Sequence, residues 1–153
     1  MDYEKKLKQY MSERKVEGRH LSFEVSCHSI ADAAEAVNGE PGDFVKNVCM
    51  MTSDDQLIVA IVGGEENASS KKVGKALGVE WPRLARPEEI LKKTGYPCGG
   101  IPSFGFSAIF LIDPKVLEKD VIYTGGGSEN SLVKVSPKHL QHLNQATVVR
   151  IRR

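Results

Sequence analysis

FVKNVCMMTSDDQLIVAIV, residues 44–62, carries the strongest secondary-structure signal in this 153-residue chain. It contains two apolar segments, 44–51 and 57–62, which are rich in the side chains that favour buried strands. The residues between them, 53–55, are Ser-Asp-Asp, a sequence common in turns. The stretch therefore predicts two consecutive strands of one sheet.

Helical and strand patterns alternate on both sides of these two strands. Tyr3, Leu7 and Met11 recur at helical spacing and predict an amphipathic helix at the start of the chain. Ser29 followed by Asp32 resembles a capping box and precedes an alanine-rich segment. The other predicted elements are a strand at 21–25, helices at 30–37 (ending at Gly39), 70–77 and 87–94, strands at 107–112, 121–124 and 132–135, a helix at 137–143 and a strand at 147–151.

These elements predict a mixed α/β fold. Strands outnumber helices and the two kinds interleave irregularly, so a regular βαβ repeat is not expected. The length fits one domain, and neither a repeat nor a linker interrupts the pattern. Residues 1–153 are therefore expected to form a single domain, with a twisted or partly closed mixed β-sheet surrounded by helices.

The composition excludes several classes of protein. Apolar residues make up 41% of the chain and charged residues 27%, and no run of about 18 apolar residues could span a membrane. Residues 1–15 lack the apolar core of a secretory signal, so a cytoplasmic location is expected. Cys27, Cys49 and Cys98 have no C-x-x-C spacing, so neither a disulfide framework nor a zinc knuckle is predicted.

Basic residues cluster locally although the net charge is only +1. The segment 71–93 contains seven basic and three acidic residues, and Arg150, Arg152 and Arg153 add charge at the C-terminus. Such a distribution indicates either a local basic face for an anionic partner or an ordinary solvated surface. The sequence alone leaves both interpretations open.

Lys46 is unusual because it lies within an apolar predicted strand. With the two-residue periodicity of a strand, it shares a face with Val48 and Met50, whereas Asn47 shares the other face with Val45. A lysine is seldom buried without a partner. Lys46 is therefore either a charged residue that protects an edge strand or a pocket residue that donates to a phosphate or carbonyl group.

Two glycine-rich segments are candidate binding loops. Residues 95–105, GYPCGGIPSFG, are too rich in glycine and proline for regular structure, and residues 125–128 read GGGS. Backbone N–H groups in such loops can bind a phosphate or a developing oxyanion, although tight connecting turns explain the same composition. Neither segment matches a P-loop or the dinucleotide-binding fingerprint.

The histidines do not predict a metal site. His28 follows Cys27, but adjacent strand residues point to opposite faces, so a pocket or loop position is favoured over a Cys/His pair. His139 and His142 are three residues apart on a predicted helix without a third ligand nearby. No G-x-S-x-G sequence is present. Neither a metal nor another cofactor is therefore expected.

Several motifs in order resemble the YbaK/prolyl-tRNA-synthetase-associated domain family, between about Ser22 and Val149. Each motif is modest alone, and their order makes the resemblance specific. The motifs are HSIADAA (28–34), FVKNV (44–48), TGYPCGGIPSFG (94–105), IFLID (109–113), VIYTGG (121–126) and SPKHL (136–140).

The resemblance implies a free-standing aminoacyl-tRNA deacylase with the family's fold, acting on the mischarged 3′ end of tRNA. Its partners would be tRNA and, as a second candidate, an aminoacyl-tRNA synthetase, with no membrane partner. The substrate would carry a small amino acid such as alanine, cysteine or serine. The implied catalytic residues are Lys46, Gly99, Gly100 and Ile101, and the implied substrate-binding residues are His28, Asn47, Pro102, Ser103, Thr124, Gly125 and Gly126.

One departure from the family's Gly-x-x-x-Pro motif keeps other functions open. If Gly99 is the motif's glycine, Ser103 stands where the proline is expected and Pro102 lies one residue early. This change favours the main alternative, a non-catalytic module that binds aminoacyl-tRNA or a synthetase. A third interpretation is a nucleotide or small-molecule site that uses the glycine loops.

Overall fold

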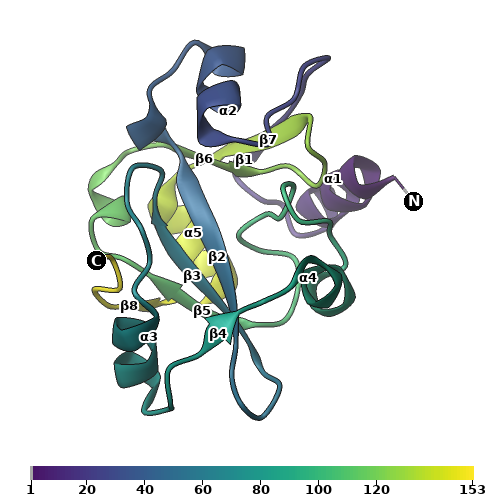
Figure 1. Cartoon of the computed structure of the whole chain (residues 1–153). Coiled ribbons are helices and arrows are strands. Elements are labelled where there is room, and N and C mark those ends of the chain that lie inside the picture. Colours follow the sequence, from purple (N-terminus) through teal and green to yellow (C-terminus); the bar gives the residue numbers. More distant parts are fainter. Residues whose placement is uncertain (1) are drawn as a thin grey trace.

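The structure, a computed structural model, describes residues 2–153, and its elements confirm the mixed α/β class (Figure 1). The helices are α1 (Tyr3–Glu13), α2 (Ile30–Val37), α3 (Ser70–Leu77), α4 (Pro87–Thr94) and α5 (Pro137–Asn144), with 3₁₀ turns η1 (Pro41–Asp43) and η2 (Val116–Glu118). The strands are β1 (Gly18–Ser22), β2 (Val45–Met51), β3 (Leu57–Gly63), β4 (Arg83–Leu84), β5 (Ile109–Ile112), β6 (Ile122–Gly125), β7 (Ser131–Val135) and β8 (Thr147–Val148).

The stretch 44–62 forms β2 and β3, the antiparallel pair inside a five-stranded sheet of order β4-β2-β3-β5-β8. Its register pairs Val45 with Gly63 and Met51 with Leu57. Strands β3, β5 and β8 run parallel to one another. Leu57 to Val62 are all buried, as expected for a continuous apolar run covered on both faces.

A second sheet, of order β1-β7-β6, is antiparallel throughout and meets the first at one point. The contact is a β-bridge between Phe44, just before β2, and Tyr123 on β6, whose rings stack with centroids 5.0 Å apart. The prediction was one twisted or partly closed sheet. The structure instead has two sheets, because only this bridge continues the hydrogen bonding from β2 to β6.

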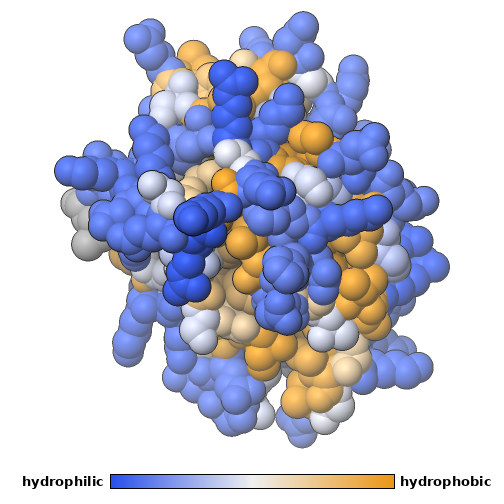
Figure 2. Space-filling model, turned by 180° about the vertical axis from the view of Figure 1, so that it is seen from behind, coloured by the Kyte–Doolittle hydropathy of each residue, from blue (hydrophilic) through white to orange (hydrophobic). Residues whose placement is uncertain are grey.

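Helices cover the sheets on several sides. Val73 of α3 packs with Met50 and Ile58 on one face of the five-stranded sheet, and Leu140 of α5 joins the core on its other face (Figure 1). Ala33 of α2 contributes to a smaller cluster near the meeting of the two sheets. Seen from behind, the surface is mostly hydrophilic, with separate apolar patches in its lower and right-hand parts (Figure 2).

Most predicted elements are confirmed, and the differences concern their ends. The strand expected at 21–25 is β1, which begins and ends three residues earlier because Gly18 to Ser22 pair with β7. Helix α2 ends at Asn38, in a left-handed conformation with φ 55°, rather than at Gly39. The strands expected at 107–112 and 147–151 are shorter, and the two-residue β4 was not predicted. None of the helices in residues 2–153 has the length and apolarity needed to cross a bilayer.

Candidate functional site

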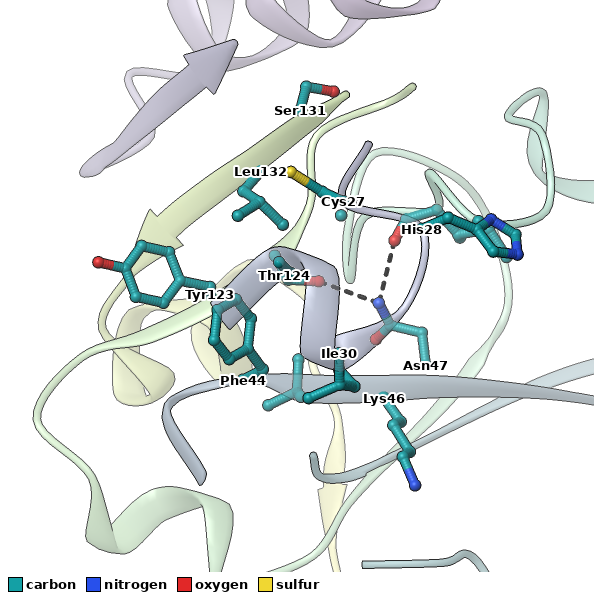
Figure 3. Close-up of a pocket in the computed structure, with 15 residues that line it drawn as sticks. Cys27, His28, Ile30, Phe44, Lys46, Asn47, Tyr123, Thr124, Ser131 and Leu132 are labelled. Carbon is teal, nitrogen blue, oxygen red and sulfur yellow. Dashed lines mark hydrogen bonds between the residues drawn. The ribbon is translucent and has the colours of Figure 1, made fainter. Parts of the chain in front are cut away.

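A cavity of about 320 Å³ lies where the two sheets meet, beneath α2 and beside the 95–105 loop (Figure 3). Seven of the eleven predicted site residues line it: His28, Lys46, Asn47, Gly99, Ile101, Thr124 and Gly125. Gly100, Pro102, Ser103 and Gly126 lie outside the lining. The predicted residues from β2, β6 and the glycine loop therefore converge, although they are as much as 97 residues apart in the chain, as His28 and Gly125 are.

The apolar wall of the cavity comes from residues that were not predicted to form the site. Ile30 and Ala33 on α2, Phe44 before β2, and Leu132 on β7 supply most of it. Each belongs to an ordinary apolar pattern in the sequence, and no local signal separates pocket residues from core residues. Only the packing of α2 across the junction of the sheets reveals their position.

Asn47, Ser103 and Thr124 form a closed ring of hydrogen bonds beside the cavity. Asn47 Nδ2 donates to Thr124 Oγ1 at 2.9 Å, and Ser103 Oγ donates to Asn47 Oδ1 at 2.6 Å. The two hydroxyl oxygens are 2.7 Å apart, and because the Ser103 proton is already committed, Thr124 must be the donor of this third bond. Ser103 and Thr124 are buried and Asn47 is partly buried, so most of this ring is shielded from water.

The ring also fixes the glycine loop. The second Nδ2 proton of Asn47 binds the carbonyl oxygen of Ile101 at 3.0 Å, and Asn144 Nδ2 donates to the carbonyl oxygen of Ser103 at 2.9 Å. Ser103, expected to contact substrate, is instead fully buried and occupies the position where the family motif has proline. The Ser103 hydroxyl hydrogen-bonds to Asn47 and Thr124 and so helps to hold the loop in position.

Lys46 and Asn47 point in different directions, as the strand alternation predicts (Figure 3). Val48 and Met50 pack on the Lys46 side of β2, and Val45 packs on the Asn47 side. The Lys46 ammonium group donates to the carbonyl oxygen of Glu66 at 2.9 Å. Lys46 therefore lines the cavity that the glycine loop borders, but its charged end is held at the rim and not against that loop.

The two glycine-rich segments pack backbone against backbone. A Cβ atom on Gly125 would lie 2.2 Å from the carbonyl oxygen of Ile101, and one on Gly100 would lie 2.7 Å from the nitrogen of Ser128. The N–H of Gly127 donates to the carbonyl oxygen of Gly100 at 2.7 Å. Such a close approach excludes side chains, which explains why both segments contain glycine.

Two main-chain N–H groups of the loop, in residues that line the cavity, form no hydrogen bond within the described part of the chain. Gly100 N–H is used, because it donates to Pro97 O at 3.0 Å. The N–H groups of Gly99 and Ile101, which both line the cavity, meet no acceptor within residues 2–153. Gly99 also has a φ of 94°, a conformation that glycine adopts readily.

The titratable side chains of the cavity offer no activated nucleophile. Burial raises the pKa of the Cys27 thiol, and the nearby Asp32 carboxylate raises it further, so the thiol stays protonated at neutral pH. His28 is exposed, and its Nδ1 lies 3.6 Å from a carboxylate oxygen of Glu129. In residues 2–153, no three His, Cys, Asp or Glu side chains are grouped as a metal site. Chemistry here would rely on main-chain donors and Lys46.

The structure is a small mixed α/β domain with a cavity where its two sheets meet. The sequence pattern of the aminoacyl-tRNA editing domain matches residues 24–143, more than three quarters of the chain. The chain belongs to this family. The resemblance seen in the sequence motifs is thereby confirmed.

Individual relatives agree with the family. The uncharacterized protein YwhH of Bacillus subtilis (strain 168) is 26% identical over 129 residues, which cover 82% of this chain and 81% of YwhH. A proline–tRNA ligase of Anaeromyxobacter sp. (strain Fw109-5) is 32% identical over 78 residues, 50% of this chain but only 14% of the ligase. This chain thus corresponds to a small part of the ligase.

Solved structures share the fold over its whole length. The hypothetical protein APE2540 has a TM-score of 0.89 and 25% identity, covering 97% of this chain and 99% of that one. The crystal structure of a proposed trans-editing enzyme for prolyl-tRNA synthetase has a TM-score of 0.91 and 23% identity, covering 100% and 98%. These matches confirm the mixed α/β architecture.

Proposed function

We propose that residues 1–153 work as a single free-standing editing domain that hydrolyses the ester bond of mischarged aminoacyl-tRNA in the cytoplasm. The observation that carries the proposal is the pair of free N–H groups at Gly99 and Ile101, which border the same cavity as Lys46. Family membership and the shared fold support it. By analogy with the relatives' names, prolyl-tRNA synthetase would be the source of the errors.

The chemistry needs only a held ester, a water molecule and stabilised negative charge. As water attacks the ester carbonyl, the oxygen of that carbonyl becomes an oxyanion that the N–H groups of Gly99 and Ile101 would bind. The bond between the acyl carbon and the ribose oxygen then breaks, the proton of the attacking water passes to that ribose oxygen, and the products are a free amino acid and tRNA. Each well-placed donor is worth about 3–4 kcal/mol in such reactions. Lys46 would bind the phosphate or ribose oxygens of the tRNA end at the cavity rim.

The cavity favours a small amino acid. Its volume of about 320 Å³ is near the lower end for ligand pockets and would have to hold both an aminoacyl group and part of the terminal nucleoside. Ile30, Phe44 and Leu132 form an apolar wall of this cavity, to which we assign the substrate side chain. We therefore expect alanine and cysteine to be removed faster than serine, whose hydroxyl would lose a water contact against that wall.

A non-catalytic binding module is the second candidate. The observation that favours it is the Lys46 ammonium group, which binds Glu66 O and does not approach the loop amides. Such a module would bind aminoacyl-tRNA, alone or on a synthetase, without shortening the lifetime of the ester.

A panel of tRNAs bearing alanine, cysteine, serine or the cognate proline tests the proposal. At limiting protein concentration, we expect multiple turnovers with alanine and cysteine, slower release of serine and no effect on proline. Equal loss of all four esters, at the rate in buffer, would refute the deacylase proposal. A larger rate with proline than with alanine would refute the assignment of the small-residue pocket.

A further inference from the structure

A continuous series of contacts leads from the cavity rim to α3. The Lys46 ammonium group lies 3.5 Å from Asn67 Oδ1, and Asn67 O accepts a bond from the N–H of Arg153 at 2.9 Å. Next to it, Lys72 on α3 donates through its ammonium group to Arg152 O at 2.8 Å. Figure 1 shows the C-terminus and α3 on the same side of the molecule. The rim and α3 are thus joined through the C-terminal residues.

Exposed basic side chains without acidic partners lie along this series of contacts between the cavity rim and α3. Within 71–93, Arg83 pairs with Glu89, Arg86 with Glu88 and Glu89, and Lys93 with Asp55, so much of the predicted basic face is neutralised. Of the other basic residues of this segment, Lys92 lies on α4, whereas Lys71, Lys72 and Lys75 lie together on α3, near the arginines of the C-terminus. We call Lys71, Lys75, Arg150 and Arg153 the basic strip, since each is exposed and forms no ion pair within residues 2–153.

An exposed tryptophan lies beside the strip. Trp81, the only tryptophan of the chain, is 67% exposed, and the Lys71 ammonium group is 5.8 Å from its ring centroid. Its backbone is held firmly, since a Cβ on Gly74 of α3 would lie 3.3 Å from Trp81 Cα, and Ser70 Oγ donates to Pro82 O. An exposed aromatic ring with an adjacent cation suits the stacking and charge of nucleic acid.

We propose that the basic strip and Trp81 bind the acceptor arm of the tRNA whose 3′ end enters the cavity. The inference rests on the proposed function and extends it to a second contact surface. Lys71 and Lys75 are one helical turn apart and repel each other, a cost that phosphate groups would offset. RNA duplexes are recognised mainly through their backbone, so this surface would add affinity without selecting the amino acid.

Two substrates distinguish the contribution of the basic strip to activity from that of the cavity. The variant Lys71→Glu/Lys75→Glu is compared with wild type on alanyl-tRNA and on the alanyl ester of a CCA trinucleotide, which is too short to reach α3. We expect KM for alanyl-tRNA to rise about 10- to 100-fold, with kcat unchanged, and the plot of log KM against log salt to lose about two units of slope. The trinucleotide ester should react as with wild type. The matched control is Lys5→Glu/Lys8→Glu on α1, on the opposite side of the molecule, which should resemble wild type (Figure 1).

Trp81 fluorescence tests binding without hydrolysis. Titration with uncharged tRNA should quench the emission of the wild-type protein and of the α1 control at low salt, but not that of Lys71→Glu/Lys75→Glu over the same range. Unchanged emission with tRNA, or an equal loss of affinity in the α1 control, would overturn the proposal. If wild type binds through the strip but hydrolyses no ester, the deacylase proposal fails and the docking surface stands.

Discussion

Lys46 and Asn47 are neighbours on β2, and the two faces they belong to are built differently. Asn47 uses both amide protons and its oxygen in a ring with Ser103 and Thr124 and in the bond to Ile101 O. Lys46 makes one bond of 2.9 Å to a loop carbonyl and a longer one of 3.5 Å to Asn67. The polar groups of one face are satisfied by hydrogen bonds among themselves, whereas the other face carries a cation that binds a loop carbonyl at the rim.

The contrast gives the two residues different roles: Asn47 positions the loop, and Lys46 is free to bind a ligand. A buried ring in which every polar atom has a partner gives one loop conformation, because any other arrangement leaves polar atoms without hydrogen bonds. A lysine held by a single carbonyl can turn toward a ligand at little cost. We therefore expect changes at Lys46 to affect activity alone, and changes around Asn47 to affect stability and activity together.

Lys46→Ala is expected to have the largest effect on rate. Removing the cation should lower single-turnover deacylation about 100- to 1,000-fold, because the tRNA end would no longer hold the ester in position against the loop amides. The free energy of unfolding should change by about 1 kcal/mol or less, since the variant loses one part-buried bond to Glu66 O and a longer exposed one to Asn67. Lys46→Arg, which keeps the charge, should recover part of the rate. An unchanged rate in Lys46→Ala would remove this residue from the site.

Gly125→Ala should act through the backbone. The new methyl group would lie 2.2 Å from Ile101 O, so the loop must shift, and a displacement of about 1 Å can reduce a rate about 100-fold. Overpacking should also cost about 1–3 kcal/mol in urea unfolding. Gly63→Ala is the control, because its methyl group would find only an ordinary contact at 3.6 Å. Wild-type activity in Gly125→Ala would show that the deacylation rate does not depend on the position of the 95–105 loop.

Thr124→Val opens the ring while keeping its shape. Asn47 Nδ2 and Ser103 Oγ each lose one of their two hydrogen-bond partners, so the free energy of unfolding should fall by about 1–3 kcal/mol. We expect the deacylation rate to fall about tenfold, because the N–H groups of the loop would be held less firmly in position. Thr52→Val, a buried threonine at the other end of β2, should lower stability without changing the rate. Equal rates in both variants would limit the ring to a structural role.

The response to pH distinguishes the two faces further. The Asn47 ring has no titratable group, whereas Asp113, beyond the Lys46 face, binds Arg152 through its carboxylate. Burial raises the pKa of Asp113, but N–H groups of Lys115, Ile151 and Arg152 and the Arg152 guanidinium outweigh it, and the net shift is downward. Because the pKa of Asp113 is lowered in the native state, its carboxylate stabilises the fold at pH values above the unfolded pKa of about 4. This stabilisation is lost as the pH falls.

Asp113→Asn should therefore be less stable than wild type at pH 7, and this difference should shrink as the solution is acidified below about pH 4. Thr124→Val should keep a constant difference over the same range. Urea unfolding at several pH values measures both. A constant difference for Asp113→Asn would mean that its carboxylate contributes nothing through its charge.

The sequence predicted the strands and the helix caps, but not the hydrogen bonds between residues far apart in the chain. The alternation of Lys46 and Asn47, the strands 44–51 and 57–62, and helix caps such as Ser29 and Gly95 follow from short-range patterns and are confirmed. The ring was not predictable, because Asn47 and Ser103 are 56 residues apart and a serine hydroxyl has many potential partners. The substrate-binding role of Ser103 stays a prediction, whereas its hydrogen bonds to Asn47 and Thr124 were not visible in the sequence.

The division into two sheets was also missed. Phe44 and Tyr123 belong to apolar patterns that fit either one closed sheet or two, and only their stacked packing decides between these arrangements. The cavity wall depends on the same junction. Residue types thus indicated which groups would form the site, while their hydrogen bonds depended on long-range packing.

Single-turnover hydrolysis of alanyl-tRNA with excess wild-type protein tests the central claim most directly. If the free amides of Gly99 and Ile101 act on the ester, its decay should become at least about 100-fold faster than in buffer and should saturate with protein concentration. A decay equal to that in buffer, or slower while the tRNA is demonstrably bound, would contradict catalysis and identify a module that only binds.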